Sequence, residues 1–187
     1  MVWNEIVSAV CIYLSSTIFT VSLFLKSKTK LLALQLLSSV FYISNFAFVI
    51  SILPSALVGT ITAICEMIRV VVFCVIANRE KLNTRKNNLI AGIAFSVVLS
   101  FCVAFSWCGA ISLLPLLGSI LVSMALGSKN LYLLKGAILL QTAMITTYLF
   151  LLGLVLNAIA QLIVFAIGTT SLIVMLVKDK KTRNQMR

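Results

Sequence analysis

Long apolar runs separated by short polar or small breaks fill almost the whole chain. They predict helices over seven ranges: 5–25, 31–51, 56–77, 89–106, 110–126, 131–152 and 154–177. Each run is close to the roughly 20 residues that cross a bilayer as a helix. A helix satisfies its own backbone hydrogen bonds in lipid, which an open strand cannot do. The pattern therefore predicts an all-α membrane protein with about seven transmembrane helices.

The weakest break in this pattern is the segment Trp107-Cys108-Gly109. Without it, one helix would run over 89–126 and would be roughly 57 Å long at 1.5 Å per residue. That length is too great for a single crossing. We therefore predict two spans here, as we do on either side of Pro54-Ser55.

Composition supports a lipid environment for the entire chain. Hydrophobic residues make up 61% of it and charged residues only 10%, too few to cover a water-soluble surface. Seven spans leave no room for a second domain, so we predict a single polytopic domain over 1–187.

The placement of the basic residues explains the net charge of +11. Thirteen of the fifteen lysines and arginines lie between or after apolar runs: Lys26, Lys28, Lys30, Arg79, Lys81, Arg85, Lys86, Lys129, Lys178, Lys180, Lys181, Arg183 and Arg187. Every second loop carries them, and the alternate loops carry none. This is the pattern that places basic loops in the cytoplasm. It predicts an external N-terminus and a cytoplasmic C-terminus, and it argues against nucleic acid as a partner.

An internal repeat relates the two halves of the chain. A shift of 101 positions aligns VSLFLKSK (21–28) with VSMALGSK (122–129), with five of eight residues identical. The same shift places the first three spans on the last three. We therefore predict two parallel three-helix repeats, about 5–77 and about 110–177, joined by a connector helix over 89–106 and followed by a basic cytoplasmic tail over 178–187.

Three segments carry a family resemblance. The basic loop after the first span, AICEMIR (63–69) and LLPLLGSILVSMAL (113–126) resemble the YgjV-type bacterial inner-membrane proteins. The 3+1+3 order is similar to that of SWEET and PQ-loop carriers, although this chain has no Pro-Gln dipeptide. The resemblance implies a multi-pass protein of the bacterial inner membrane and leaves the substrate open.

The third span contains an acidic and a basic residue deep in the apolar run. Glu66 lies near mid-membrane, and Arg69 follows on the same helical face at a spacing of three. A charge at this depth costs about 2.5–3.5 kcal/mol on insertion scales, so such residues are usually paired or functional. Two interpretations are equally favoured: a self-neutralising structural pair, or a polar site for a substrate or proton.

Uncharged polar residues fall at similar depths in other spans. The candidates for a midplane substrate site are Gln141, Asn45, Gln161, Asn157, Ser16 and Ser119, together with Glu66 and Arg69. For any one of them, a hydrogen bond between helices is the simpler explanation. Lys135 lies one turn inside the sixth span, where it could gate the cytoplasmic side or anchor the helix at the membrane surface; we favour the anchor.

These residues favour transport over catalysis. The chain has no histidine and no C-x-x-C pair among its five cysteines, so we expect no enzyme activity, no metal site and no cofactor. The leading hypothesis is a transporter of a small polar metabolite, with lipids as its surroundings. The alternative is a non-transporting interaction, assembly or regulatory protein. Seven helices suffice for a pathway, so a homodimer is optional.

Overall fold

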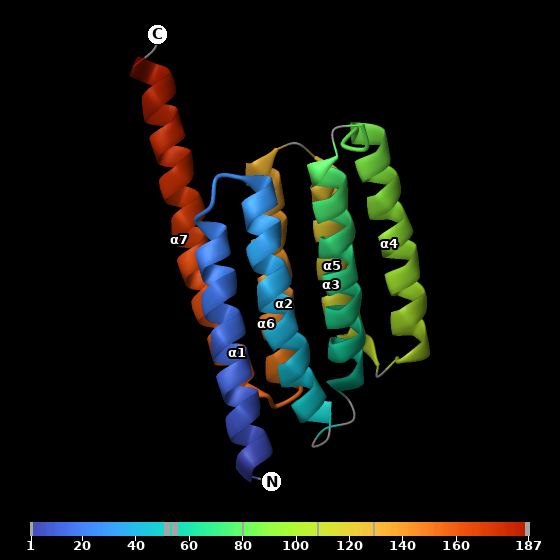
Figure 1. The fold of residues 1–187 in the computed structure, drawn as a ribbon. Helices are drawn as coiled ribbons and strands as arrows, with labels where there is room; N and C mark the ends of the chain where they lie inside the picture. Colours follow the sequence, from blue (N-terminus) through green and yellow to red (C-terminus); the bar gives the residue numbers. More distant parts are fainter. Residues whose placement is uncertain are drawn as a thin grey trace.

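The computed structural model describes residues 2–50, 53, 56–79, 81–107, 109–128 and 130–185. Within these residues the chain forms seven α-helices and a short 3-10 turn (Figure 1): α1 (Val2–Leu23), α2 (Lys28–Ile50), α3 (Leu57–Asn78), α4 (Arg85–Phe105), η2 (Ala110–Ser112), α5 (Leu113–Leu126), α6 (Leu131–Leu151) and α7 (Val155–Gln185). The predicted breaks at Pro54-Ser55 and Cys108, and the basic residues Lys129 and Arg187, lie outside the described residues.

The all-α prediction is confirmed. Six of the described helices are long and apolar enough to cross a membrane, and a shorter apolar segment, Ala110–Leu126, lies among them. The short segment begins after Gly109, where the chain reverses direction with a φ of 96°. Glycine adopts this φ without the steric penalty that a side chain would cause. Pro115 falls in the first turn of α5, where its missing N–H costs no helical bond.

Three helices extend beyond their predicted bounds into charged sequence. Helix α2 begins at Lys28 rather than residue 31, and α4 begins at Arg85 rather than residue 89. Thr84 fixes the start of α4 because its side chain accepts a hydrogen bond from Asn87 N. The predicted tail is helical as far as Gln185, because lysine, arginine and glutamine continue a helix readily.

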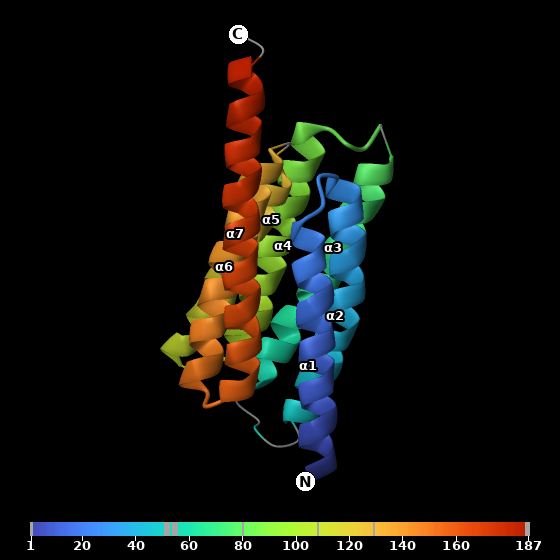
Figure 2. The ribbon, with the colours of Figure 1, turned by 90° about the vertical axis from the view of Figure 1, so that its left-hand side faces the viewer.

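The seven helices form two facing layers and one flanking helix (Figures 1 and 2). One layer is α1–α2–α3 and the other is α7–α6–α5; α1 packs on α7 at one edge and α3 packs on α5 at the other. Helix α4 lies against α5 and α3, and Gly92 brings it so close to α5 that an added Cβ would lie 2.7 Å from Ser123 O. Of the equivalent helices of the two predicted repeats, α1 and α5, and likewise α3 and α7, lie diagonally opposite, while α2 and α6 are the middle helices of the two layers; each pair runs in the same direction.

The outside of the bundle is apolar. Phe101, Phe105 and Leu156 are 64%, 90% and 60% exposed, and only 28% to 50% of each long span is buried in the protein. Such a surface is unfavourable in water and suits lipid. The chain is therefore a multi-pass helical membrane protein.

The interior contains two large apolar clusters at different depths. One includes Leu23, Leu31 and Phe73, near the end of the bundle where α1, α3, α5 and α7 finish and the basic loops lie. We call this the basic end. The other cluster includes Phe46, Val49 and Leu149 and lies near the opposite end, whose loops carry no charged residue. We call that the neutral end. A polar layer separates the two clusters.

Candidate functional site

The centre of the polar layer is the Glu66 carboxylate. Its Oε1 accepts hydrogen bonds from Ser119 Oγ and from Gln141 Nε2, and Gln141 Nε2 also lies 3.1 Å from Ser119 Oγ. One carboxylate oxygen thus links α3, α5 and α6. Helices in lipid gain little from apolar contact with each other, so such polar links hold the layers in register.

Arg69 lies one turn further along α3, and its hydrogen bonds go to α5. Its guanidinium donates to Ser119 O at 2.9 Å and to Ser123 Oγ at 3.2 Å, and the side chain is buried. No direct hydrogen bond joins Glu66 to Arg69 among the described residues, and both interpretations from the sequence, a self-neutralising pair and a polar site, stay predictions. Ser119 stands between the two charges, with its hydroxyl bonded to Glu66 and its carbonyl to Arg69. This arrangement leaves one face of the carboxylate directed toward the space between the layers.

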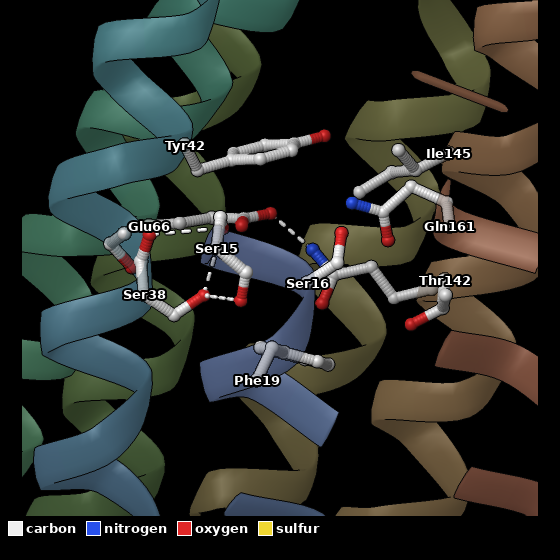
Figure 3. Close-up of a pocket in the computed structure, with 11 residues that line it drawn as sticks. Ser15, Ser16, Phe19, Ser38, Tyr42, Glu66, Thr142, Ile145 and Gln161 are labelled. Carbon is white, nitrogen blue, oxygen red and sulfur yellow. Dashed lines mark hydrogen bonds between the residues drawn. The ribbon is translucent and has the colours of Figure 1, made fainter. Parts of the chain in front are cut away.

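That space is a small polar cavity between the two helical layers (Figure 3). It holds about 60 Å³ of space for water and is lined by Ser15, Ser16, Phe19, Ser38, Ser39, Tyr42, Glu66, Gln141, Thr142, Ile145 and Gln161. A single water needs roughly 10–15 Å³ of such space, so there is room for about four to six. The lining comes from five helices, α1, α2, α3, α6 and α7, all of one chain.

One lining group has no partner of its own. Ser16 is only 7% exposed, and its Oγ makes no hydrogen bond among the described residues. Ser15 and Ser38, by contrast, are fully engaged: each hydroxyl donates to the other residue's backbone carbonyl, at 3.0 and 2.9 Å. A buried hydroxyl without a partner costs free energy unless a water or ligand supplies one.

A second polar cluster lies closer to the neutral end. Asn45 Oδ1 accepts from Ser8 Oγ at 2.7 Å and from Asn157 Nδ2 at 3.4 Å. Ser8 and Asn157 also line a separate hollow of about 300 Å³ between α1, α2 and the α6–α7 turn. This cluster joins the first repeat to the second between the hollow and the central cavity.

Two lysines join the repeats at the basic end. Lys28, at the start of α2, donates to Leu126 O at the end of α5, at 2.7 Å. Lys135, near the start of α6, donates to Leu23 O at the end of α1, at 2.6 Å. We call these contacts the lysine bridges. They are reciprocal, because each joins the second helix of one repeat to the first helix of the other, and both satisfy a carbonyl at a helix C-terminus.

Lys135 corrects a prediction from the sequence. Its side chain is 1% exposed, so it does not reach the membrane surface as an anchor. The C-terminus of α1 offers the Lys135 ammonium group a carbonyl acceptor inside the protein, Leu23 O, at 2.6 Å.

The eight predicted site residues divide into three groups. Ser16, Glu66, Gln141 and Gln161 line the cavity. Ser119 and Arg69 lie behind Glu66, while Asn45 and Asn157 belong to the cluster nearer the neutral end. Sequence reasoning missed the contribution of α2, namely Ser38 and Tyr42. These two and Asn45 are spaced by four and three, which places them on one helical face and could have identified it.

No family model matches the chain, and no curated protein or solved structure shows significant similarity to it. Fold and site together define a multi-pass helical membrane protein whose two three-helix layers enclose a polar cavity around a carboxylate.

Proposed function

We propose that the protein is a carrier that moves a small polar solute across the membrane through the cavity around Glu66. The observation that carries this proposal is the cavity itself, which lies between two three-helix layers, has room for a few waters and is lined by hydroxyl and amide side chains and the Glu66 carboxylate. Carriers built from parallel repeats bind substrate near the bilayer midplane at the interface between repeats.

The energetics of the lining support a binding role. A carboxylate surrounded by hydroxyl and amide groups in a membrane interior is costly unless these groups are paired or used. A purely architectural polar layer would be dry and fully paired. Here Ser16 Oγ has no partner among the described residues, and the cavity has room for water. The lining is therefore arranged for an occupant.

The two apolar clusters support a conformational cycle in which one side opens at a time. The cluster around Leu23 and Phe73 covers the cavity toward the basic end, and the cluster around Phe46 and Leu149 covers it toward the neutral end. We propose that the two layers rock about the centre, parting one cluster while the other stays packed. The lysine bridges then belong to the state that is closed at the basic end.

Charge gives this proposal an orientation. Basic loops gather at one end, which under the positive-inside rule faces the cytoplasm. The N-terminus of α1 is then external. The resemblance to YgjV-type proteins favours the bacterial inner membrane as the location, and the 3+1+3 helix order favours a SWEET-like carrier over an enzyme.

Two-sided cysteine labelling tests the proposal without knowledge of the substrate. Ser39 lines the cavity, and among the described residues its hydroxyl bonds only to Gln35 O of its own helix, so Ser39→Cys in a chain without its native cysteines disturbs little. A carrier predicts labelling by a membrane-impermeant maleimide from each side. The matched control is Ser100→Cys on α4, outside the cavity, whose hydroxyl likewise bonds only within its helix.

Protection of the cysteine at position 39 from both sides, equal to that at position 100, would contradict the carrier. It would favour the alternative, an interaction or assembly protein whose polar layer never meets water.

A further inference from the structure

Most hydroxyls of the cavity wall that have a partner donate to the protein itself, while Ser16, Tyr42 and Gln161 line the cavity with groups that can both donate and accept. A hydroxyl has one hydrogen to donate and two lone pairs that accept. Thr142 and Ser39 donate to carbonyls of their own helices, Ile138 O and Gln35 O, at 2.9 and 2.8 Å. Ser15 and Ser38 donate to each other's backbone carbonyls. Four of the lining hydroxyls thus donate their hydrogens to backbone carbonyls of the protein, which leaves their lone pairs to accept hydrogen bonds.

Glu66 and Gln141 also present acceptor oxygens to the cavity. Glu66 is acceptor-only as a carboxylate, and both of its protein donors address Oε1, which leaves Oε2 without a partner among the described residues. Gln141 uses its Nε2 on Glu66 and Ser119, so its carbonyl oxygen is the group left over. Within the described part of the chain no lysine or arginine lines the cavity; Arg69 bonds on the far side of Ser119.

Aromatic rings complete the enclosure. Phe19 and Tyr42 lie at opposite ends of the lining along the bundle axis, and the Glu66 carboxylate lies at a level between them (Figure 3). The Tyr42 ring is held edge-on by Phe46 at a centroid distance of 5.0 Å. The faces of such rings attract cations, and more so where water is scarce.

We infer that the ligand of this cavity is a small organic cation bearing a primary ammonium group, an inference that rests on the proposed carrier function. An ammonium group carries three N–H donors and no acceptor, which complements the free carboxylate oxygen of Glu66 and the lone pairs of the hydroxyl and amide groups around it. A carboxylate-bearing ligand would meet Glu66 as a like charge. A neutral polyol would offer one donor per hydroxyl and forgo the charge-assisted bond.

The space limits the size of the ligand. About 60 Å³ corresponds to roughly four to six water-sized groups, so the part of the ligand that the cavity holds has about four to six non-hydrogen atoms. Ethanolamine has this size. Ethylene glycol and acetate match it as a neutral and an anionic analogue.

Binding of these compounds to the purified chain in lipid nanodiscs tests the inference, measured by titration calorimetry at one pH and ionic strength. Ethanolamine should bind about tenfold or more tightly than either analogue, since charged hydrogen bonds are about twice as strong as neutral ones. Glu66→Gln should remove that preference. Asp179→Asn, which neutralises a carboxylate on α7 outside the cavity, should keep it.

A second variant covers the case in which Glu66→Gln does not fold. Phe19→Leu keeps an apolar side chain of similar size in the core and removes one ring face. It should weaken ethanolamine several-fold and leave ethylene glycol unchanged. Equal or tighter binding of ethylene glycol or acetate to the wild type, or no binding of ethanolamine, would overturn the ammonium assignment. The carrier function is tested separately by cysteine labelling at position 39, an experiment that needs no ligand.

Discussion

The two ends of the bundle are closed by different means. At the basic end a large apolar cluster, including Leu31 and Ile138, is reinforced by the two lysine bridges. At the neutral end the apolar cluster is smaller, and a hollow of about 300 Å³ lies beside it. The polar link between the repeats there is a hydrogen bond of 3.4 Å from Asn157 Nδ2 to Asn45 Oδ1. Charged hydrogen bonds are stronger than neutral ones. If the two layers rock as we propose, the basic end is the more firmly closed one and the neutral end should open at lower cost.

The largest expected effect comes from the buried lysine bridge. In Lys135→Met the bond to Leu23 O is lost, and a hydrogen bond to a charged group contributes about 1.5–3 kcal/mol. If the bond exists only in the closed state, the open population at the basic end rises about tenfold or more. Labelling of the cysteine introduced at position 39 should increase accordingly from the basic side. Lys81→Met, an exposed lysine at the same end, is the control and should change nothing; equal effects of both would show that bulk charge, and not the bridge, governs closure.

Packing at the basic end gives the next effect. In Gly168→Ala the new Cβ would lie 2.6 Å from Leu139 Cδ2 and 2.7 Å from Leu23 Cδ1. Both contacted atoms are the ends of leucine side chains, which can shift, so we expect a cost at the lower end of the overpacking range, about 1 kcal/mol, and a correspondingly lower unfolding temperature in detergent. Gly136→Ala meets no atom within 4 Å and should be neutral or slightly stabilising. Identical behaviour of the two variants would mean that the basic half is packed more loosely than described.

The partly buried lysine bridge should matter less than the buried one. Lys28 is half-buried, so water replaces part of what its bond to Leu126 O supplies. We expect Lys28→Met to cost about 1 kcal/mol and to raise labelling from the basic side about fivefold. A larger effect than that of Lys135→Met would reverse the ranking of the two bridges.

The smallest effect is expected at the neutral end. Asn45→Ala removes the acceptor of Ser8 and Asn157, but water from the adjoining hollow can replace it. Labelling of the cysteine at position 39 from the neutral side should rise about threefold, from a loss below about 1 kcal/mol. Ser44→Ala, whose hydroxyl bonds only to Val40 O, is the control. A rise of tenfold or more would mean that this amide cluster closes the neutral end as firmly as the bridges close the other.

The sequence predicted how far along its span each polar residue lies better than it predicted which face of the helix turns toward the cavity. Span positions follow from runs of apolar residues, so the helices were predicted and their charged extensions, such as Lys28–Lys30 of α2, were not. Depth along the chain likewise identified Glu66 and Gln141. It could not separate Asn45 and Asn157 from the cavity, because a helix that is apolar on nearly every side gives no signal about which face turns inward.

Partner choice was also beyond the sequence. Glu66 and Arg69 share a helical face, which favours a direct pair. Which groups they bond depends on the Ser119 hydroxyl and carbonyl of α5, and these reach the pair only through the packing of α5 on α3.

Spin-label distances across both ends of the bundle test the central claim, two layers that rock about the cavity, most directly. Labels at Lys30 and Leu133 report on the basic end, and labels at Leu57 and Leu156 report on the neutral end; all four residues are exposed. In lipid nanodiscs, Lys135→Met should lengthen the first distance and shorten the second, because opening one end closes the other. Unchanged distances at both ends, or lengthening at both, would contradict a rocking carrier.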